Sequence, residues 1–221
     1  MLRYIFKCAD SYCTGLSPFY LMIYSIVVGL ETKSAFEFGA GWSTRVILDA
    51  LKGTGGHLYS ISTDSQKDVM IKTEMISGNP IGPGVHDVEQ YYSEYSENWT
   101  HCQGKSETYL KNLRTQNIKE PFGFVLHDGS HTEEVVYNDL VFILQKMKYN
   151  SVLLVHDVLH SHCGKGMRNA VDKALKPYEY EIATLPYGFG LSIIVLKDNK
   201  HNGIVEIKRH KPTSQFLTEV L

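Results

Sequence analysis

Short apolar runs alternate along the chain with longer segments in which apolar residues recur every three or four positions. The short runs have the length and residue types of β-strands, and the longer segments have the period of amphipathic helices. We predict strands at 34–38, 57–62, 100–103, 122–126, 151–155, 180–184 and 191–196. Strands that alternate with helices are typical of an α/β protein with a mainly parallel sheet.

Two strands and two helices carry more specific signals. The strand 151–155 is apolar on both faces, which places it in the middle of the sheet. No helix separates the last two strands, so we expect them to pair as a hairpin. Ser43 or Thr44 is expected to cap the helix that ends at Gly53. Ser130 and Glu133 have the spacing of a capping box for the helix after the fourth strand. Further helices are predicted at 66–76 and 167–175.

The segment Ser11–Leu30 has no charged residue, and its second half is strongly apolar. A membrane span and a signal peptide are the alternatives to a buried helix. Serine, threonine, glycine and proline interrupt the run, and no clear cleavage site of small residues follows it. We therefore predict a buried helix with Pro18 in its first turn, and no membrane partner.

The 221 residues are 43% hydrophobic and 21% charged, a composition typical of a globular domain. We expect an N-terminal helical segment at 1–33, the main domain at 34–197 and a polar tail at 198–221. A formal net charge of -2 argues against a nucleic-acid partner. The four scattered cysteines suit neither a disulfide framework nor a four-cysteine zinc site, which indicates a cytoplasmic location. The sequence leaves a homo-oligomer possible.

Unusual residues follow the predicted strands, where open α/β sheets bind their ligands. The first strand ends in Glu37-Phe38-Gly39-Ala40-Gly41, and glycines there let a ligand approach the backbone. A plain tight turn is the alternative. Thr44 stands where a dinucleotide-binding fingerprint has its third glycine. A carboxylate beside the turn suits an amino-bearing ligand better than a phosphate.

This turn resembles the first motif of the class I S-adenosylmethionine-dependent methyltransferases. The stretch Asp128-Gly129-Ser130-His131 and the strand end His156-Asp157 are similar to those of a branch that includes small-molecule O-methyltransferases. The resemblance extends over about 17–197. It implies a Rossmann-like open sheet of about seven mostly parallel strands with an antiparallel last strand and helices on both faces.

The resemblance also implies which residues hold S-adenosylmethionine. Glu37, Gly39 and Gly41, with Ser43 and Asp128 beside them, would hold the amino-acid part of the cofactor. A carboxylate after the second strand would bind the ribose. Ser62 occupies that position here, and Ser62 and the nearest acid, Asp64, are the candidates. Either Asp64 reaches the ribose or the ribose contact is weakened. Lys105 replaces an acid that is common near the adenine.

Asp128 and Asp157 end neighbouring strands in this fold, and neighbouring strands lie about 4.8 Å apart. Two carboxylates that close repel each other unless a cation, a proton or a hydrogen-bond donor lies between them. Mg²⁺ bound to Asp128 and Asp157 would meet this need and could bind a substrate diol. Val158 stands where metal-dependent relatives often have a further ligand. A helix cap and a loop cap are the structural alternatives for the two acids.

Five histidines cluster near the same strand ends: His127, His131, His156, His160 and His162. A histidine can accept a proton from a substrate hydroxyl near neutral pH. His131 is our first candidate for this base and His160 the second, whereas His127 and His156 are expected to be structural. His160, His162 and Cys163 suggest zinc, but a solvated loop explains them better. The tyrosine-rich stretch 91–99 is a substrate lid or a packing segment.

We therefore expect a methyltransferase that acts on an oxygen of a small-molecule acceptor, with metal assistance possible. Its catalytic residues would be His131, Asp128 and His160. One alternative is a methyltransferase-like module that binds cofactor weakly and serves interactions. An NAD-dependent oxidoreductase is the other, and Thr44 argues against it.

Overall fold

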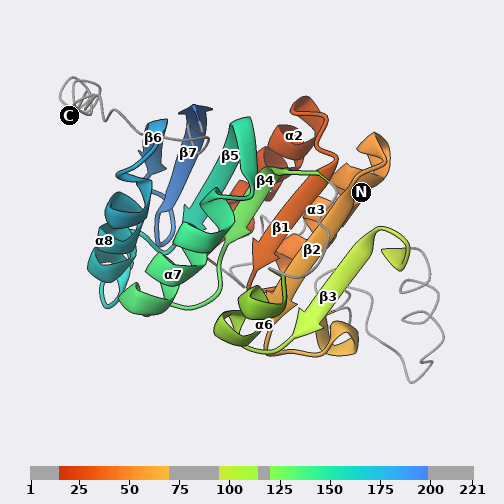
Figure 1. Cartoon of the computed structure of the whole chain (residues 1–221), viewed down its shortest axis with the longest axis horizontal. Coiled ribbons are helices and arrows are strands. Elements are labelled where there is room, and N and C mark those ends of the chain that lie inside the picture. Colours follow the sequence, from red (N-terminus) through yellow and green to blue (C-terminus); the bar gives the residue numbers. More distant parts are fainter. Residues whose placement is uncertain (1–14, 70–94, 114–119, 199–221) are drawn as a thin grey trace.

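A computed structural model describes residues 15–69, 95–113 and 120–198 of the chain (Figure 1). Its centre is a seven-stranded sheet with the order β3-β2-β1-β4-β5-β7-β6. The strands are β1 (Ser34–Phe38), β2 (His57–Ser62), β3 (Trp99–Gln103), β4 (Phe122–His127), β5 (Met147–His156), β6 (Glu179–Leu185) and β7 (Leu191–Asp198). Strand β7 runs antiparallel to both of its neighbours, and the other described pairs are parallel. The predicted fold class is confirmed.

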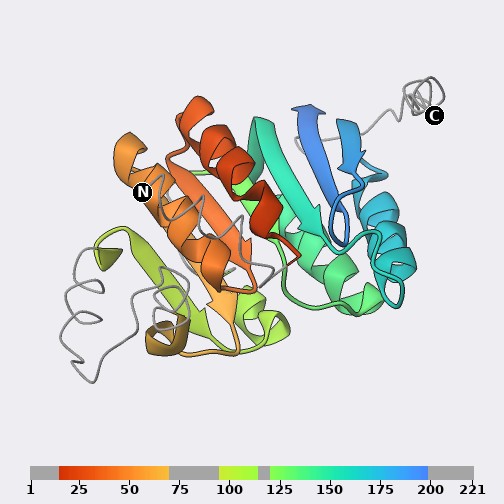
Figure 2. The same ribbon diagram turned by 180° about the vertical axis from the view of Figure 1, so that it is seen from behind.

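Helices cover both faces of this sheet, as Figures 1 and 2 show from opposite sides. They are η1 (Ser17–Phe19), α2 (Tyr20–Gly29), α3 (Trp42–Thr54), α6 (Ser106–Leu113), α7 (Glu133–Leu144) and α8 (Gly164–Leu175). Helices α2 and α3 pack on one face, and α6, α7 and α8 pack on the other.

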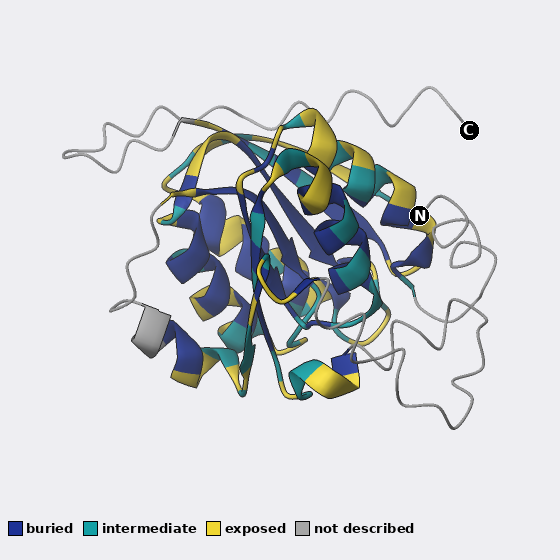
Figure 3. Ribbon diagram, turned by 90° about the vertical axis from the view of Figure 1, so that its right-hand side faces the viewer, coloured by how far each residue is buried: buried dark blue, intermediate teal, exposed yellow. Residues whose placement is uncertain are grey.

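The central strands explain why two cores form. Successive side chains of a strand point to opposite faces. Leu126 and Leu154 therefore join the core beneath α2 and α3, whereas Val125 and Leu153 join the core beneath α7 and α8. The central strands β1, β4 and β5 are accordingly buried along most of their length (Figure 3).

The N-terminal helix is buried on one face only. Pro18 lies in the short 3-10 helix η1 directly before α2, rather than in the first turn of α2 itself. Tyr20, Ile23 and Val27 of α2 are buried against the sheet. Leu21 is 44% exposed, because the outward face of α2 has no covering element among the described residues. Within the described part of the chain, no helix has the length and apolar character needed to cross a membrane.

Two helix starts differ from the prediction. Helix α3 begins at Trp42, and its N-cap residue is Gly41 rather than Ser43 or Thr44. Thr44 still takes part in the cap, because its hydroxyl accepts a hydrogen bond from the Gly41 N–H at 2.8 Å. The prediction of a capping box formed by Ser130 and Glu133 is wrong, because the N-cap residue of α7 is Thr132 and no side chain caps this helix. The Glu133 carboxylate instead accepts hydrogen bonds from Asn169 and Lys173 of α8.

Some predicted features lie outside the described residues. They include Cys8 and Cys13, most of the helix 66–76, Tyr91 and Tyr92, and nearly all of the tail 198–221. Tyr95 and Trp99, from the end of the tyrosine-rich stretch, are buried in the core. The proposed domain bounds stay a prediction.

Candidate functional site

The loops after β1 and β4 are pressed together at the carboxyl edge of the sheet. Gly39 has a φ of +84°, and a Cβ built there would lie 2.0 Å from the carbonyl oxygen of Asp128. The Gly39 N–H donates to Ile61 at 2.8 Å, and the Asp128 N–H donates to Phe38 at 2.9 Å. Only glycine fits at position 39, because both its φ and the close approach exclude a side chain.

A cavity of about 540 Å³ opens beside these loops. It extends across the ends of β1, β2, β3 and β4, which is where the predicted cofactor residues lie. Four of these residues line it: Gly39, Ser62, Asp64 and Asp128. Lys105, the departure noted near the adenine position, lines it as well. The lining does not include Glu37, Gly41 or Ser43.

Glu37 is fully buried and serves the fold directly. Its two carboxylate oxygens accept hydrogen bonds from the hydroxyls of Ser43 and Thr44, both at 2.6 Å. Burial raises the pKa of Glu37 to about 8, although these two hydrogen bonds act in the opposite direction. Glu37 therefore links the first turn of α3 to β1. It supports the turn beside the cavity without lining the cavity itself.

A chain of hydrogen bonds from β3 holds the loop after β2. The Trp99 indole donates to the Ser60 hydroxyl at 2.7 Å, and that hydroxyl is 2.8 Å from His101 Nδ1. The other ring nitrogen, Nε2, is 2.9 Å from the Asp64 carbonyl oxygen. A carbonyl only accepts, so Nε2 carries the proton and Nδ1 accepts from Ser60. The chain therefore fixes the Asp64 backbone at the edge of the larger cavity.

A second cavity, of about 250 Å³, lies on the other side of Asp128. It is lined by Gly15, Leu16, Asp128, His131, His156, Asp157, His160, Cys163 and Phe189. The structure thus brings together the predicted catalytic residues Asp128, His131 and His160 with Asp157. Asp128 lines both cavities and forms part of the wall between them.

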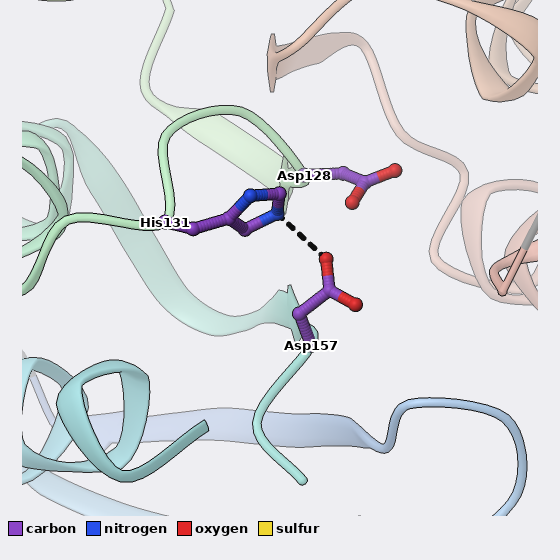
Figure 4. Close-up of side chains that lie close together, drawn as sticks. All are labelled: Asp128, His131 and Asp157. Carbon is purple, nitrogen blue, oxygen red and sulfur yellow. Dashed lines mark hydrogen bonds and ion pairs between the residues drawn. The ribbon is translucent and has the colours of Figure 1, made fainter. Parts of the chain in front are cut away.

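Two histidines and two aspartates form a connected chain in this cavity. His131 Nε2 is 2.7 Å from Asp157 Oδ2. Figure 4 marks this contact with a dashed line. His156 Nδ1 is 3.2 Å from the same oxygen and 3.0 Å from Asp128 Oδ1. Each carboxylate therefore has an imidazole nitrogen within hydrogen-bonding distance.

This chain changes the proton affinity of its members. Burial disfavours the charged form of His156, yet the hydrogen bonds to Asp128 and Asp157 outweigh it and raise its pKa to about 10. Burial acts against the Asp157 carboxylate too, but the hydrogen bonds from His131 and His156 hold its pKa well below the usual range. The hydrogen bond to Asp157 raises the pKa of His131.

His156 and His101 were not among the predicted functional residues. His156 was expected to be structural, but it contacts both aspartates of the site. Its position directly before Asp157 at the end of a buried strand is the signal that could have found it. His101 carries no such signal, because its role depends on the register between β2 and β3, in which it lies opposite Ser60.

The family model described as a methyltransferase domain matches residues 36–158, more than half of the chain. The chain belongs to this methyltransferase family. The match confirms the predicted S-adenosylmethionine-dependent methyltransferase and spans β1 to the end of β5, including Gly39, Asp128 and Asp157. No curated protein sequence matches this methyltransferase.

Solved structures share the fold of this methyltransferase at low sequence identity. An O-methyltransferase from Bacillus cereus in complex with SAH is 14% identical, with a TM-score of 0.60 over 80% of each chain. The SAH-bound methyltransferase PaMTH1 from Podospora anserina is 13% identical, with a TM-score of 0.58 over 89% of this chain and 87% of that one. MycE, solved with Mg, SAH and mycinamycin VI, is 13% identical, with a TM-score of 0.55 over 93% of this chain and 56% of that one.

The residues of the methyltransferase's second cavity do not match the preference of Mg²⁺. Asp128, His131 and Asp157 each offer one ligand atom, and these atoms lie within 4.8 Å of one another. Mg²⁺ prefers oxygen ligands in octahedral geometry, whereas one of these three is an imidazole nitrogen. Val158 is fully buried and offers no side-chain oxygen, and His156 already contacts both carboxylates.

Proposed function

We propose that this methyltransferase transfers the methyl group of S-adenosylmethionine to a hydroxyl oxygen of a small molecule. The cofactor would occupy the larger cavity and the acceptor the smaller one. The observation that carries the proposal is the position of Asp128, which lines both cavities beside the pair formed by His131 and Asp157. A donor and an acceptor bound there would meet across one shared wall.

His131 is the proposed base. When Nε2 donates its proton to Asp157, the opposite ring nitrogen, Nδ1, is left as a proton acceptor. The acceptor hydroxyl gives its proton to Nδ1 as its oxygen attacks the methyl carbon. The bond between that carbon and the sulfonium sulfur breaks, and S-adenosylhomocysteine leaves. Asp157 then stabilises the imidazolium through the bond at Nε2.

Positioning supplies the rest of the proposed mechanism. Methyl transfer is an in-line displacement, so its rate depends mainly on how well donor and acceptor are aligned. General-base catalysis contributes typically about 10²- to 10⁴-fold. His160 lies 4.6 Å from Phe189, measured between ring centroids, and both line the acceptor cavity. We assign this aromatic pair to acceptor binding, with His131 retained as the base.

The test combines cofactor binding with methyl transfer. Calorimetric titration with S-adenosylhomocysteine should give saturable binding, and radiolabelled S-adenosylmethionine should label a member of a panel of catechols, phenols and sugars. His131→Asn should lower kcat by about 100-fold or more while leaving S-adenosylhomocysteine affinity within about twofold. His162→Asn is the matched control, because His162 is exposed and lies outside the cavity lining.

The possible failures have different meanings. Absence of S-adenosylhomocysteine binding would overturn the proposal as a whole. Binding without labelling of any panel member would favour the interaction module, and binding of NADH instead would favour an oxidoreductase. An undiminished kcat in His131→Asn would remove His131 as the base.

A further inference from the structure

The two aspartates of the acceptor cavity already share one hydrogen-bond donor. His156 Nδ1 lies 3.0 Å from Asp128 Oδ1 and 3.2 Å from Asp157 Oδ2. Two carboxylates on neighbouring strands need a cation, a proton or a donor between them. An N–H of His156 meets that need from within the protein.

The end of β5 is bent so that His156 and Asp157 can act together. Consecutive side chains of a regular strand point to opposite faces, which would keep these two apart. Asp157 has a φ of +62°, a left-handed conformation that non-glycine residues rarely adopt. The bend breaks the alternation, and both side chains line the same cavity.

The imidazole of His156 is enclosed, so it has little room to move aside for an ion. The residue is 3% exposed, and the Phe19 ring meets it edge-on with 6.5 Å between centroids. The backbone at Gly15 passes over it so closely that a Cβ there would lie 3.1 Å from His156 Cε1. Displacing the ring would require this part of the chain to move as well.

We infer that His156 replaces a divalent cation in this methyltransferase, holding Asp128 and Asp157 together so that the acceptor site works without a metal. His156 contacts both aspartates, and His131 gives Asp157 a second imidazole partner. The part of this inference that concerns activity rests on the proposed function. The part that concerns ion binding does not, because Mn²⁺ binding to the two aspartates can be measured without a methyl acceptor.

The test measures the binding of Mn²⁺ to the full chain by electron paramagnetic resonance. At Mn²⁺ concentrations up to about 1 mM, which would occupy even a weak site of this kind, wild-type protein and Asp128→Asn should bind the same amount of Mn²⁺. The two aspartates of the wild-type protein would then hold no ion. His156→Ala removes the donor that the two carboxylates share and leaves Asp157 with His131 alone. Its Mn²⁺ affinity should therefore rise at least tenfold, and adding Asp157→Asn should abolish the gain. His156→Asn is the matched control, because its amide N–H can replace the one at Nδ1 and should keep the site closed to Mn²⁺.

Activity gives a second readout where an acceptor has been found. Chelation with EDTA should leave the wild-type kcat unchanged within about twofold. Wild-type Mn²⁺ binding that Asp128→Asn abolishes would overturn the inference even if His156→Ala failed to fold, as would loss of activity on chelation. A protein that shows no methyl transfer but also no Mn²⁺ binding would count against the proposed function and leave this inference standing.

Discussion

Replacing Gly39 by alanine tests the packing that brings the two strand-end loops together. The added Cβ would lie 2.0 Å from the Asp128 carbonyl oxygen and 2.8 Å from the Gly129 Cα, so the backbone of one loop must shift. The left-handed φ of +84° costs an alanine about 1–2 kcal/mol. Overpacking against backbone adds about 1–3 kcal/mol. We expect Gly39→Ala to lose about 2–5 kcal/mol of stability.

Thermal unfolding followed by circular dichroism measures this loss. For a chain of this size, the expected loss lowers Tm by about 4–20 °C. Gly41→Ala is the matched control, since Gly41 has an extended φ of -169° and no heavy atom lies within 4 Å of its Cβ position. Gly41 is the N-cap residue of α3, where alanine is less favourable than glycine, so this variant should lose no more than about 1 kcal/mol. Equal Tm values for the two variants would refute the assignment of different roles to the two glycines.

Three further predictions concern other parts of the molecule. The pKa of Glu37 is raised from 4.5 to about 8, so between these pH values the unfolded chain loses a proton that the folded chain keeps. Stability should therefore fall by a few kcal/mol as pH rises from 4.5 to 8, and denaturant titrations of Glu37→Gln should show a flatter pH profile. His101→Phe breaks the hydrogen-bond chain that holds Asp64 and should weaken S-adenosylhomocysteine binding by about tenfold in calorimetry, the equivalent of one hydrogen bond. His57→Phe breaks a hydrogen bond between the same two strands, to Thr100, and should leave this affinity unchanged. Phe124→Ala empties a fully buried position and should cost about 3–5 kcal/mol in urea denaturation, with a loss below about 1 kcal/mol contradicting its place in the core.

The sequence was most informative where a single strand determines the outcome. A strand apolar on both faces must be central, and Asp157 follows such a strand, so its position at the carboxyl edge could be predicted. The proximity of Asp128 and Asp157 required the strand order, which came from the resemblance to methyltransferases. The sheet order and the antiparallel β7 then agreed with that expectation.

The sequence was less informative where a side chain had a choice of partners. Glu37 stands beside the glycine turn, but its position does not show that its carboxylate turns toward Ser43 and Thr44. Glu133 has the spacing of a capping box, yet its partner Lys173 lies 40 residues further along the chain. The spacing of nearby residues does not show that a side chain from a distant part of the sequence will bind the Glu133 carboxylate instead.

The wall that Asp128 forms between the two cavities has a thermodynamic consequence. A ligand on one side of the wall alters the surroundings of a carboxylate that borders the other side. Suppose that bound S-adenosylmethionine changes the affinity for the acceptor by some factor. By linkage, the bound acceptor must change the affinity for S-adenosylmethionine by the same factor. Occupancy of the two chambers is therefore expected to be cooperative, in one direction or the other, before any bond is made or broken.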